Sequence, residues 1–345
     1  MNPLDMLPIP LLEWYQDNQR SLPWREDSTP YRVWVSEIML QQTRVAAVLG
    51  YFNRFMQALP TVWDLAAVSE DELLKLWQGL GYYSRARNLQ KAAKQIVTDF
   101  AGCFPKNYAD LRSLCGVGDY TAAAIASISF GLPYPAVDGN LLRVVARLTA
   151  DYDDITTPAM KKKVTQALTE IIPAKAPGAF NQAMMDLGAT VCLPNGAPLC
   201  ASCPLSGFCE AKQKGVAALL PVRASKKARR IEERDVFMIF HHDRVALRQR
   251  SEKGLLAKLW EYPNELSTQE DPTIPYDLEG ETPRFAGVGR HIFSHVEWHL
   301  RIFVLQVQEA SLAHNWVWAT RQELLERYAI PNAFSACSAI LEDYL

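Results

Sequence analysis

The sequence predicts a multidomain protein in which an all-α domain is followed by a smaller α+β domain. Its 345 residues are enough for two domains or three, and with 49% hydrophobic residues they can form packed cores. Through position 220, apolar side chains recur three and four positions apart, whereas β-rich runs dominate afterwards. A basic stretch without apolar periodicity separates the two parts.

The segment 1–220 is expected to fold as successive helices. Trp34, Ile38, Gln41 and Val45 illustrate the helical spacing, and strand-like alternation is rare. Short glycine-containing breaks, such as those at residues 79–81 and 116–118, divide the helices. We therefore assign residues 1–220 to one helical domain.

Residues 221–234 are polar and basic, so they are expected to form an exposed linker. The domain that follows, 235–345, is of mixed type. Strands are expected over 236–240, 245–248 and 302–307, with a turn at His242-Asp243, and helices over 322–328 and 333–345.

The formal net charge of −2 gives no sign of a nucleic-acid partner. Residues 1–220 carry 20 basic and 20 acidic side chains, so any binding of DNA must use local patches and backbone donors. No apolar stretch approaches the roughly 20 residues that span a bilayer, and residues 1–16 do not resemble a signal peptide. A cytoplasmic location is expected, associated with the nucleoid if the source is prokaryotic.

Four of the seven cysteines lie within eighteen residues: Cys192, Cys200, Cys203 and Cys209. Thiols this dense, in a chain without a secretion signal, favour a metal or a cluster over disulfides. Structural zinc commonly uses two Cys-x2-Cys pairs, whereas one such pair with unequal flanking spacers suits a four-thiolate iron-sulfur cluster. We expect a 4Fe-4S cluster, with zinc as the alternative.

The segment containing Gly116 and Gly118 joins the end of one expected helix to the start of the next. Glycine lets the backbone approach a ligand closely, and the amides at the following helix N-terminus can bind phosphate without net positive charge. The alternative is an ordinary glycine cap between packed helices.

Two carboxyl groups could carry chemistry in the helical domain, which contains no histidine. Glu37 lies among apolar neighbours, and burial would raise its pKa and keep it protonated near neutrality. Asp138 precedes a helix, where N–H donors and the helix dipole favour the ionised form, although many such residues are only caps. A proton donor facing an anion is the arrangement that glycosidic-bond cleavage requires.

Several motifs together resemble the MutY-type adenine DNA glycosylases, members of the helix-hairpin-helix superfamily that also contains endonuclease III. Besides the four cysteines, the resemblance rests on Leu22-Pro-Trp-Arg25, Ser36-Glu-Ile-Met-Leu-Gln-Gln-Thr43, Gly79-Leu-Gly-Tyr-Tyr-Ser-Arg85, Gly116-Val-Gly118, Val137-Asp-Gly-Asn140 and Phe180-Asn-Gln-Ala-Met-Met-Asp-Leu-Gly188. It implies a six-helix barrel over about 25–135 and a cluster subdomain made of 1–24 and 136–220.

The resemblance implies removal of adenine mispaired with 8-oxoguanine or guanine, with the adenine flipped out of duplex DNA by a monomer. Glu37 would protonate the base and Asp138 would stabilise the sugar cation, with Tyr120 and Asn140 supporting them. The matched positions of the adenine pocket are Trp24, Arg25, Leu40, Gln182 and Met185. Gln42 and Tyr82 match residues that wedge into the DNA stack, and Gly116 and Gly118 match the phosphate-binding hairpin.

The hairpin carbonyls would hold a monovalent cation, as is common in the family. Bifunctional relatives carry a lysine two positions after the second hairpin glycine, where this chain has Tyr120. A monofunctional glycosylase is therefore expected.

The C-terminal domain resembles the family's Nudix-related domain through Gly254-Leu-Leu-Ala-Lys-Leu-Trp-Glu-Tyr-Pro263 and Phe293-Ser-His295. The magnesium-binding string Arg-Glu-x-x-Glu-Glu of Nudix hydrolases is absent. Recognition of 8-oxoguanine by Phe293, Ser294 and His295 is expected instead, and the alternative is that these three belong to an ordinary strand and turn.

The chain departs from the family pattern at three places. The first cysteine spacer has seven residues where six are usual, Cys115 replaces a common proline, and Asp119 stands where a basic residue is frequent. The rival hypotheses are an endonuclease III type glycosylase/lyase acting on oxidised pyrimidines, a non-catalytic iron-sulfur DNA-binding protein, and a nucleotide hydrolase.

Overall fold

The computed structural model describes residues 2–194, 196–224, 228–267, 282–308 and 315–345. The chain divides into two compact units. The helical unit comprises Met1–Ala67 and Asn88–Ser225, and the sheet unit comprises Val68–Arg87 and Lys226–Leu345. Among the described residues, no helix is long and apolar enough to cross a membrane.

The segment 1–220 is helical, as expected. The helices are α1 Pro8–Asn18, α2 Pro23–Glu26, α3 Pro30–Leu40, α4 Val45–Ala58, α5 Val62–Ala67, α6 Glu70–Leu76, α7 Ser84–Asp99, α8 Tyr108–Ser113, α9 Asp119–Phe130, α10 Gly139–Leu148, α11 Pro158–Ile171, α12 Pro177–Thr190, the short helix η1 Cys200–Ser202 and α13 Glu210–Gln213. Proline at the first turn begins α1, α2, α3, α11 and α12, because its missing N–H would have no partner there.

One expected helical run is interrupted. The spacing of Trp34, Ile38, Gln41 and Val45 suggested a continuous helix, but α3 ends at Leu40 and α4 begins at Val45. Gln42 adopts a φ of 59°, which breaks the helical path. The apolar pattern persists across the break because both helices bury side chains in this unit.

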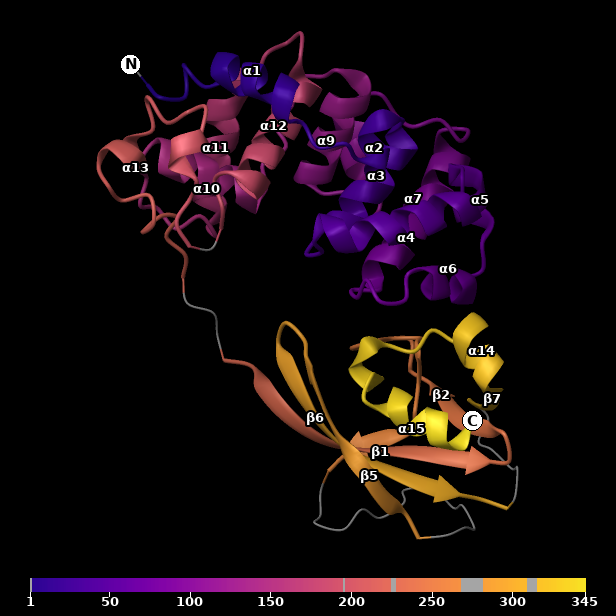
Figure 1. Cartoon of the computed structure of the whole chain (residues 1–345). Helices are drawn as coiled ribbons and strands as arrows, with labels where there is room; N and C mark the ends of the chain where they lie inside the picture. Colours follow the sequence, from indigo (N-terminus) through magenta and orange to yellow (C-terminus); the bar gives the residue numbers. More distant parts are fainter. Residues whose placement is uncertain (1, 195, 225–227, 268–281, 309–314) are drawn as a thin grey trace. The chain divides into compact units, whose positions relative to one another are not determined.

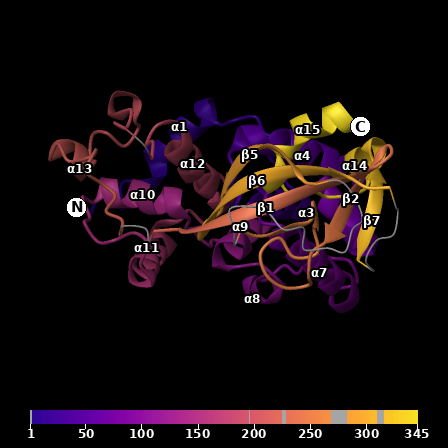
Figure 2. The same ribbon diagram turned by 90° about the horizontal axis from the view of Figure 1, so that it is seen from below.

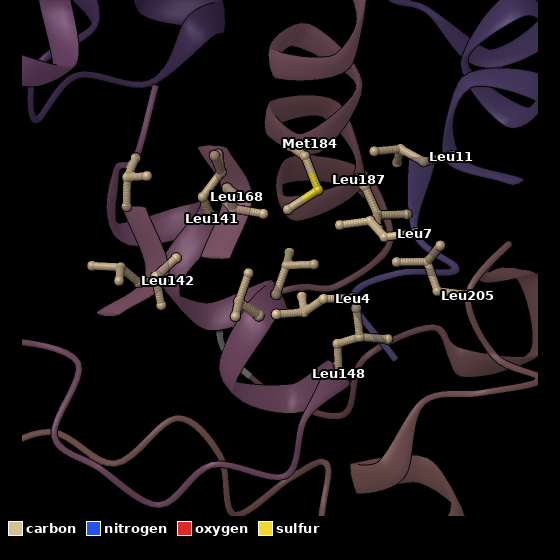
Figure 3. Close-up of a cluster of buried hydrophobic side chains, with 14 of the residues drawn as sticks. Leu4, Leu7, Leu11, Leu141, Leu142, Leu148, Leu168, Met184, Leu187 and Leu205 are labelled. Carbon is tan, nitrogen blue, oxygen red and sulfur yellow. The ribbon is translucent and has the colours of Figure 1, made fainter. Parts of the chain in front are cut away.

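A leucine-rich core joins α1, α10, α11 and α12. Figure 3 shows Leu7, just before α1, and Leu11 of α1 close to Leu187 of α12, and all three side chains are fully buried. Burial of a leucine side chain contributes on the order of 1.5–3 kcal/mol, so this core is a major stabilising term of the unit.

Buried polar contacts fix α9 and α12 beside each other. The Asn181 amide donates to Ser127 Oγ at 2.8 Å and to the Tyr134 carbonyl at 2.9 Å, and it accepts from the Ala136 N–H at 3.0 Å. A Cβ at Gly178 would lie 2.9 Å from Ile128 Cα, so glycine permits the close approach of the two helices. These contacts place the 134–138 segment at the start of α10.

The sheet unit contains β1 Arg230–His241, β2 Arg244–Gln249, β3 Trp260–Glu261, β4 Asn264–Leu266, β5 Arg284–Ile292, β6 Val296–Gln306 and β7 Trp316–Thr320, followed by α14 Arg321–Glu326, the short helix η2 Asn332–Phe334 and α15 Cys337–Tyr344. The strand order is β3-β2-β1-β6-β5, with β4 also paired to β1 and β7 to β2. Strands β1 and β6 are parallel, and the other described pairs are antiparallel.

The expected strands and the His242-Asp243 turn are confirmed, with one extension. Strand β1 begins at Arg230, inside the segment that its composition suggested as linker, because Arg230 to Arg234 pair with Val296 to Leu300 of β6. The helix expected over 333–345 is divided into η2 and α15. Figures 1 and 2 both show β1, β5 and β6 side by side, and Figure 1 shows α14 and α15 beside the sheet.

Candidate functional site

A pocket of about 840 Å³ opens within the helical unit. Its walls come from α2, α3, the 41–45 turn, the start of α9, the start of α10 and one face of α12. Its lining includes most of the residues expected in the helical part of the site: Trp24, Arg25, Glu37, Leu40, Gln42, Tyr120, Asp138, Asn140, Gln182 and Met185. The fold thus brings together positions that lie far apart in the sequence.

Glu37 projects from α3 into this pocket and is only 5% exposed. Burial is the largest influence on its carboxyl group and raises the pKa to about 7, and the nearby Asp138 charge acts in the same direction. The hydrogen bond from Tyr120 and the charge of Arg25 oppose this rise. Near neutral pH, Glu37 therefore carries a proton in a substantial fraction of molecules.

Tyr120 is the hydrogen-bond partner of Glu37. Its hydroxyl lies 2.7 Å from Glu37 Oε2 and 3.8 Å from Met185 Sδ. Burial, and then the neighbouring carboxylates, raise the pKa of the phenol well above its ordinary value. The tyrosine consequently keeps its proton and acts as a donor toward Glu37.

Asp138 caps the N-terminus of α10. Its Oδ1 accepts the backbone N–H groups of Asn140 at 2.9 Å and Leu141 at 2.8 Å, and its Oδ2 accepts from the Asn140 side chain at 2.9 Å. The expected cap is present, but the expectation that the helix terminus would govern the pKa was wrong. Burial raises the pKa of Asp138, and the three donors only offset part of that rise.

Asn140 is itself held from the far side. The Arg143 guanidinium donates to Asn140 Oδ1 at 3.1 Å and to the Gly188 carbonyl at 2.6 Å. Since Arg143 is only 2% exposed, this contact fixes the orientation of the Asn140 amide toward Asp138.

Arg25 is positioned by Asp186, a residue that the sequence interpretation did not single out. Its Nη1 and Nη2 lie 2.7 and 2.8 Å from Asp186 Oδ2 and Oδ1, and Arg20 Nε donates to Oδ1 at 2.7 Å. Burial opposes ionisation of Asp186, but hydrogen bonds from the two arginines lower its pKa below the ordinary value. An acidic residue within an expected helix carried no signal of this role.

The remaining pocket residues take distinct positions. Trp24 is buried and packs edge-on against Phe52, with ring centroids 5.1 Å apart. Gln182 accepts a 2.7 Å hydrogen bond from the Tyr15 hydroxyl. Gln42 is exposed on the 41–45 turn in a left-handed backbone conformation, which is unusual for a residue other than glycine.

The hairpin between α8 and α9 contains the two expected glycines. Gly116 has a φ of 73°, and a Cβ there would lie 2.7 Å from Asn88 Cβ, so only glycine fits this turn. Gly118 precedes the first residue of α9 and is exposed. Asp119 follows it and pairs with Arg112 at 2.6 Å, so its charge is partly balanced.

All four clustered cysteines line one small cavity. Each is partly buried, and Arg147 Nη1 lies 3.3 Å from Cys192 Sγ. Within the described ranges, however, no three His, Cys, Asp or Glu side chains are arranged to hold a single metal ion. The four thiols therefore share one space in this part of the helical unit.

The other expected residues lie in the sheet unit. Phe293, Ser294 and His295 form the turn between β5 and β6, where Ser294 and His295 are exposed. They line a pocket of about 640 Å³, whose wall also includes Tyr82. Tyr82 is 47% exposed and has a φ of 48°.

Comparisons with known families match both parts of the chain. Residues 35–174 match the HhH-GPD superfamily of base excision DNA repair proteins, and residues 235–339 match the NUDIX domain.

Curated relatives extend this likeness over most of the chain. The chain is 36% identical to an adenine DNA glycosylase of Mus musculus, over 87% of this chain and 70% of that protein. It is 34% identical to the Homo sapiens adenine DNA glycosylase, over 91% and 70% respectively. A third adenine DNA glycosylase, from Buchnera aphidicola of Schizaphis graminum, is 36% identical over 74% and 73%.

Among solved structures, the helical part resembles a thermostable thymine-DNA glycosylase, with a TM-score of 0.55, 26% identity and coverage of 61% of this chain and 97% of that one. It also resembles endonuclease III in a non-covalent DNA complex, with a TM-score of 0.53, 27% identity and coverage of 62% and 98%.

Proposed function

Since the chain belongs to the adenine DNA glycosylase family, whose members are hydrolases of N-glycosidic bonds in DNA, we propose that it removes adenine paired with 8-oxoguanine or guanine in duplex DNA. The single observation that carries the proposal is the pocket that joins the buried acid Glu37 to the capped carboxylate Asp138. We also propose that the enzyme acts as a monomer, as the family resemblance implies.

Glu37 is the general acid of the proposed reaction. Its proton passes to a ring nitrogen of the flipped adenine, and the bond between that base and the sugar then breaks with its electron pair leaving on the base. The neutral base departs, and the carboxylate of Glu37 can accept a proton from the water that adds to the sugar. The pKa of about 7 supports both roles near neutral pH.

Asp138 stabilises the positively charged sugar. Two neighbouring carboxyl groups disfavour double ionisation, so the pair holds one proton most readily. The three hydrogen bonds to Asp138 favour leaving the charge there, while the deeply buried Glu37 keeps the proton. Tyr120 and Asn140 are positioning residues for the two carboxyl groups.

We propose that the adenine is enclosed by Trp24, Arg25, Leu40, Gln182 and Met185. The pocket combines a buried indole and apolar side chains with amide and guanidinium donors, and a purine offers a flat apolar face with polar edges. Gln42 and Tyr82 are proposed to enter the DNA stack, which the exposure of both side chains supports.

The hairpin is proposed to bind the phosphate backbone and a monovalent cation through its backbone groups. Gly116 and Gly118 are both exposed, so the N–H groups near the start of α9 are accessible to an anion.

The four clustered cysteines are proposed to hold a 4Fe-4S cluster. All four thiols line one cavity, and their spacing, one Cys-x2-Cys pair with unequal flanking spacers, suits a four-thiolate cluster. The cluster would stabilise the loop that closes the helical core, where Cys192, Cys203 and Cys209 pack against buried side chains.

The domain limits follow from these roles. We propose residues 1–220 as the catalytic domain, with subdomains at 25–135 and at 1–24 plus 136–220, and residues 235–345 as the domain that recognises 8-oxoguanine through Phe293, Ser294 and His295. The exposed turn that carries these residues and the pocket beside it support this assignment.

Strand cleavage by hot alkali after incubation tests the proposal. A duplex with adenine opposite 8-oxoguanine should be cut at the adenine. The same duplex in which thymine or cytosine replaces this adenine should remain intact. Cleavage of a duplex that carries an oxidised pyrimidine, with adenine left in place, would overturn the proposal and favour the endonuclease III type activity.

A further inference from the structure

A buried ionic cluster lies in the sheet unit, close to the pocket that the turn at residues 293–295 lines. At its centre is Glu261 of β3, which is 1% exposed. Arg248 Nη2 donates to Glu261 Oε1 at 2.9 Å, Asn264 Nδ2 donates to Oε2 at 2.8 Å, and Arg250 Nη1 pairs with Oε2. The carboxylate is therefore surrounded by donors.

Burying charges in this way is costly, and a well-packed apolar core could replace such a cluster without loss of stability. What an ionic cluster adds is a fixed geometry, because a guanidinium binds its partners through a rigid planar fork.

Arg250 binds the first wall of the pocket, the loop that contains residues 254–257. The side-chain Nε of Arg250 donates to the Leu255 carbonyl at 2.9 Å, and the backbone N–H of Arg250 donates to the Leu259 carbonyl at 2.9 Å. Leu256 and Lys258 in this loop both have a φ of 58°, a conformation that surrounding contacts must hold in place for residues other than glycine. Arg250 is thus one of the side chains that hold this loop, together with Gln249, whose Nε2 donates to the Lys258 carbonyl.

Arg250 also contacts the support of the second wall, the turn at residues 293–295. Its guanidinium lies 5.7 Å from the centre of the Trp298 ring, and Trp298 packs edge-on against Phe293 with centroids 4.9 Å apart. One side chain therefore connects the buried carboxylate with two of the segments that line the pocket.

We propose that Arg250, anchored by Glu261, is a positioning residue that sets the spacing of these two lining segments, 254–257 and 293–295, and thereby the preference for an oxidised purine over guanine opposite the adenine. This inference rests on the proposed function, since it assigns the pocket to the base opposite. Arg250 acts through Leu255 and Trp298.

Arg248 provides a matched control. It binds the same carboxylate from the neighbouring strand, and it also donates to Glu265 Oε1 and to the Asn264 carbonyl, neither of which lines the pocket. The substitutions Arg250→Lys and Arg248→Lys each keep the charge and remove one guanidinium fork from Glu261.

The experiment measures single-turnover excision of adenine opposite 8-oxoguanine and opposite guanine, together with the thermal unfolding midpoint of the full chain. Arg250→Lys should reduce the preference for 8-oxoguanine roughly tenfold, as expected for a displaced contact surface, with the rate opposite guanine unchanged. Arg248→Lys should keep the preference within about twofold at a similar unfolding midpoint.

The outcomes separate the inference from the proposed function. If the wild-type protein excises adenine in neither duplex, the proposed function fails. If it does excise adenine but Arg250→Lys keeps the full preference, or both lysine variants lose preference in step with their unfolding midpoints, the positioning role is overturned. Should Arg250→Lys not fold, Glu261→Gln replaces it, and retention of full preference by that variant contradicts the inference.

Discussion

The Tyr120 hydroxyl donates a 2.7 Å hydrogen bond to Oε2 of Glu37. The bond joins α9, the second helix of the hairpin, to α3, so the element proposed to bind phosphate also contacts the proposed acid. Because a phenol with a raised pKa keeps its proton, this bond favours the carboxylate form of Glu37 and limits how far burial raises the Glu37 pKa.

The first prediction concerns the pKa of Glu37, which burial raises and the hydrogen bond from Tyr120 lowers. In the wild-type protein, excision should decline as the pH rises through about 7, because Glu37 loses its proton there. Tyr120→Phe removes a bond that stabilises the carboxylate, so the pKa of Glu37 should rise and the alkaline limb should move to higher pH. The pH dependence of single-turnover excision measures this shift. An unchanged or more acidic limb would show that the hydrogen bond does not tune Glu37.

The second prediction concerns Glu37 itself. Glu37→Gln keeps the shape of the side chain but cannot transfer a proton, so excision of adenine should fall by about 100- to 10,000-fold, the usual contribution of a general acid. Binding of the mismatched duplex, followed by fluorescence anisotropy, should be retained. Glu26→Gln is the control, since Glu26 is exposed on α2 and bonds to Ser21. Excision by Glu37→Gln at the native rate would remove this residue from the mechanism.

Much of this site could be predicted from the sequence, for identifiable physical reasons. The burial of Glu37 followed from its apolar neighbours, and the cap at Asp138 followed from its place before a helix. The direction of the Asp138 pKa could not be predicted, because burial raises it and the pocket that encloses Asp138 includes residues of α2, α3 and α12, which lie far from it in the sequence.

Other parts of the site depend on tertiary contacts that a linear pattern does not record. Asp186 lies in α12, whereas Arg20 and Arg25 lie near α2 at the start of the chain. The three residues become partners only when α12 packs near α2. The end of α3 could not be predicted either, since the helical spacing of Trp34 and Ile38 continues to Val45, and only the positive φ of Gln42 reveals the turn. In the sheet unit, pairing with β6 extends β1 into a basic segment that has no strand pattern of its own.

The third prediction is that no covalent enzyme–DNA intermediate accumulates. A Schiff base requires an amine next to the sugar, and Tyr120 provides a phenol that hydrogen-bonds to Glu37. Incubation with substrate duplex and borohydride should leave the protein unmodified in denaturing electrophoresis. A lysine-dependent glycosylase treated in parallel should give a shifted band. A shifted band of equal intensity for this protein would contradict a monofunctional mechanism.

The fourth prediction tests the proposed cluster. Cys203→Ser should abolish the brown colour and visible absorption of the purified protein and lower its unfolding midpoint, because the cysteine loop packs on the helical core. Cys103→Ser is the matched control, since Cys103 is exposed and lies outside the cysteine cavity. Iron and sulfide analysis should give four of each per chain for the control. A colourless wild-type protein that contains zinc would favour the alternative metal.

The fifth prediction concerns the buried ion pairs of Asp186, which is fully buried beneath Arg25 and Arg20. Asp186→Asn leaves both guanidinium groups without a counter-charge, so it should lower the free energy of unfolding by about 3–5 kcal/mol. The control is the pair of Asp27, which is exposed, and Arg32, which is half-buried, and Asp27→Asn should cost at most about 1 kcal/mol. Because the folded-state pKa of Asp186 is depressed, its stabilising contribution is present above the unfolded-state pKa and is lost as the pH falls through the folded-state value. The difference between wild type and Asp186→Asn in urea unfolding should therefore shrink in acid, and a difference that grows in acid would mean that the carboxylate does not stabilise the fold through its charge.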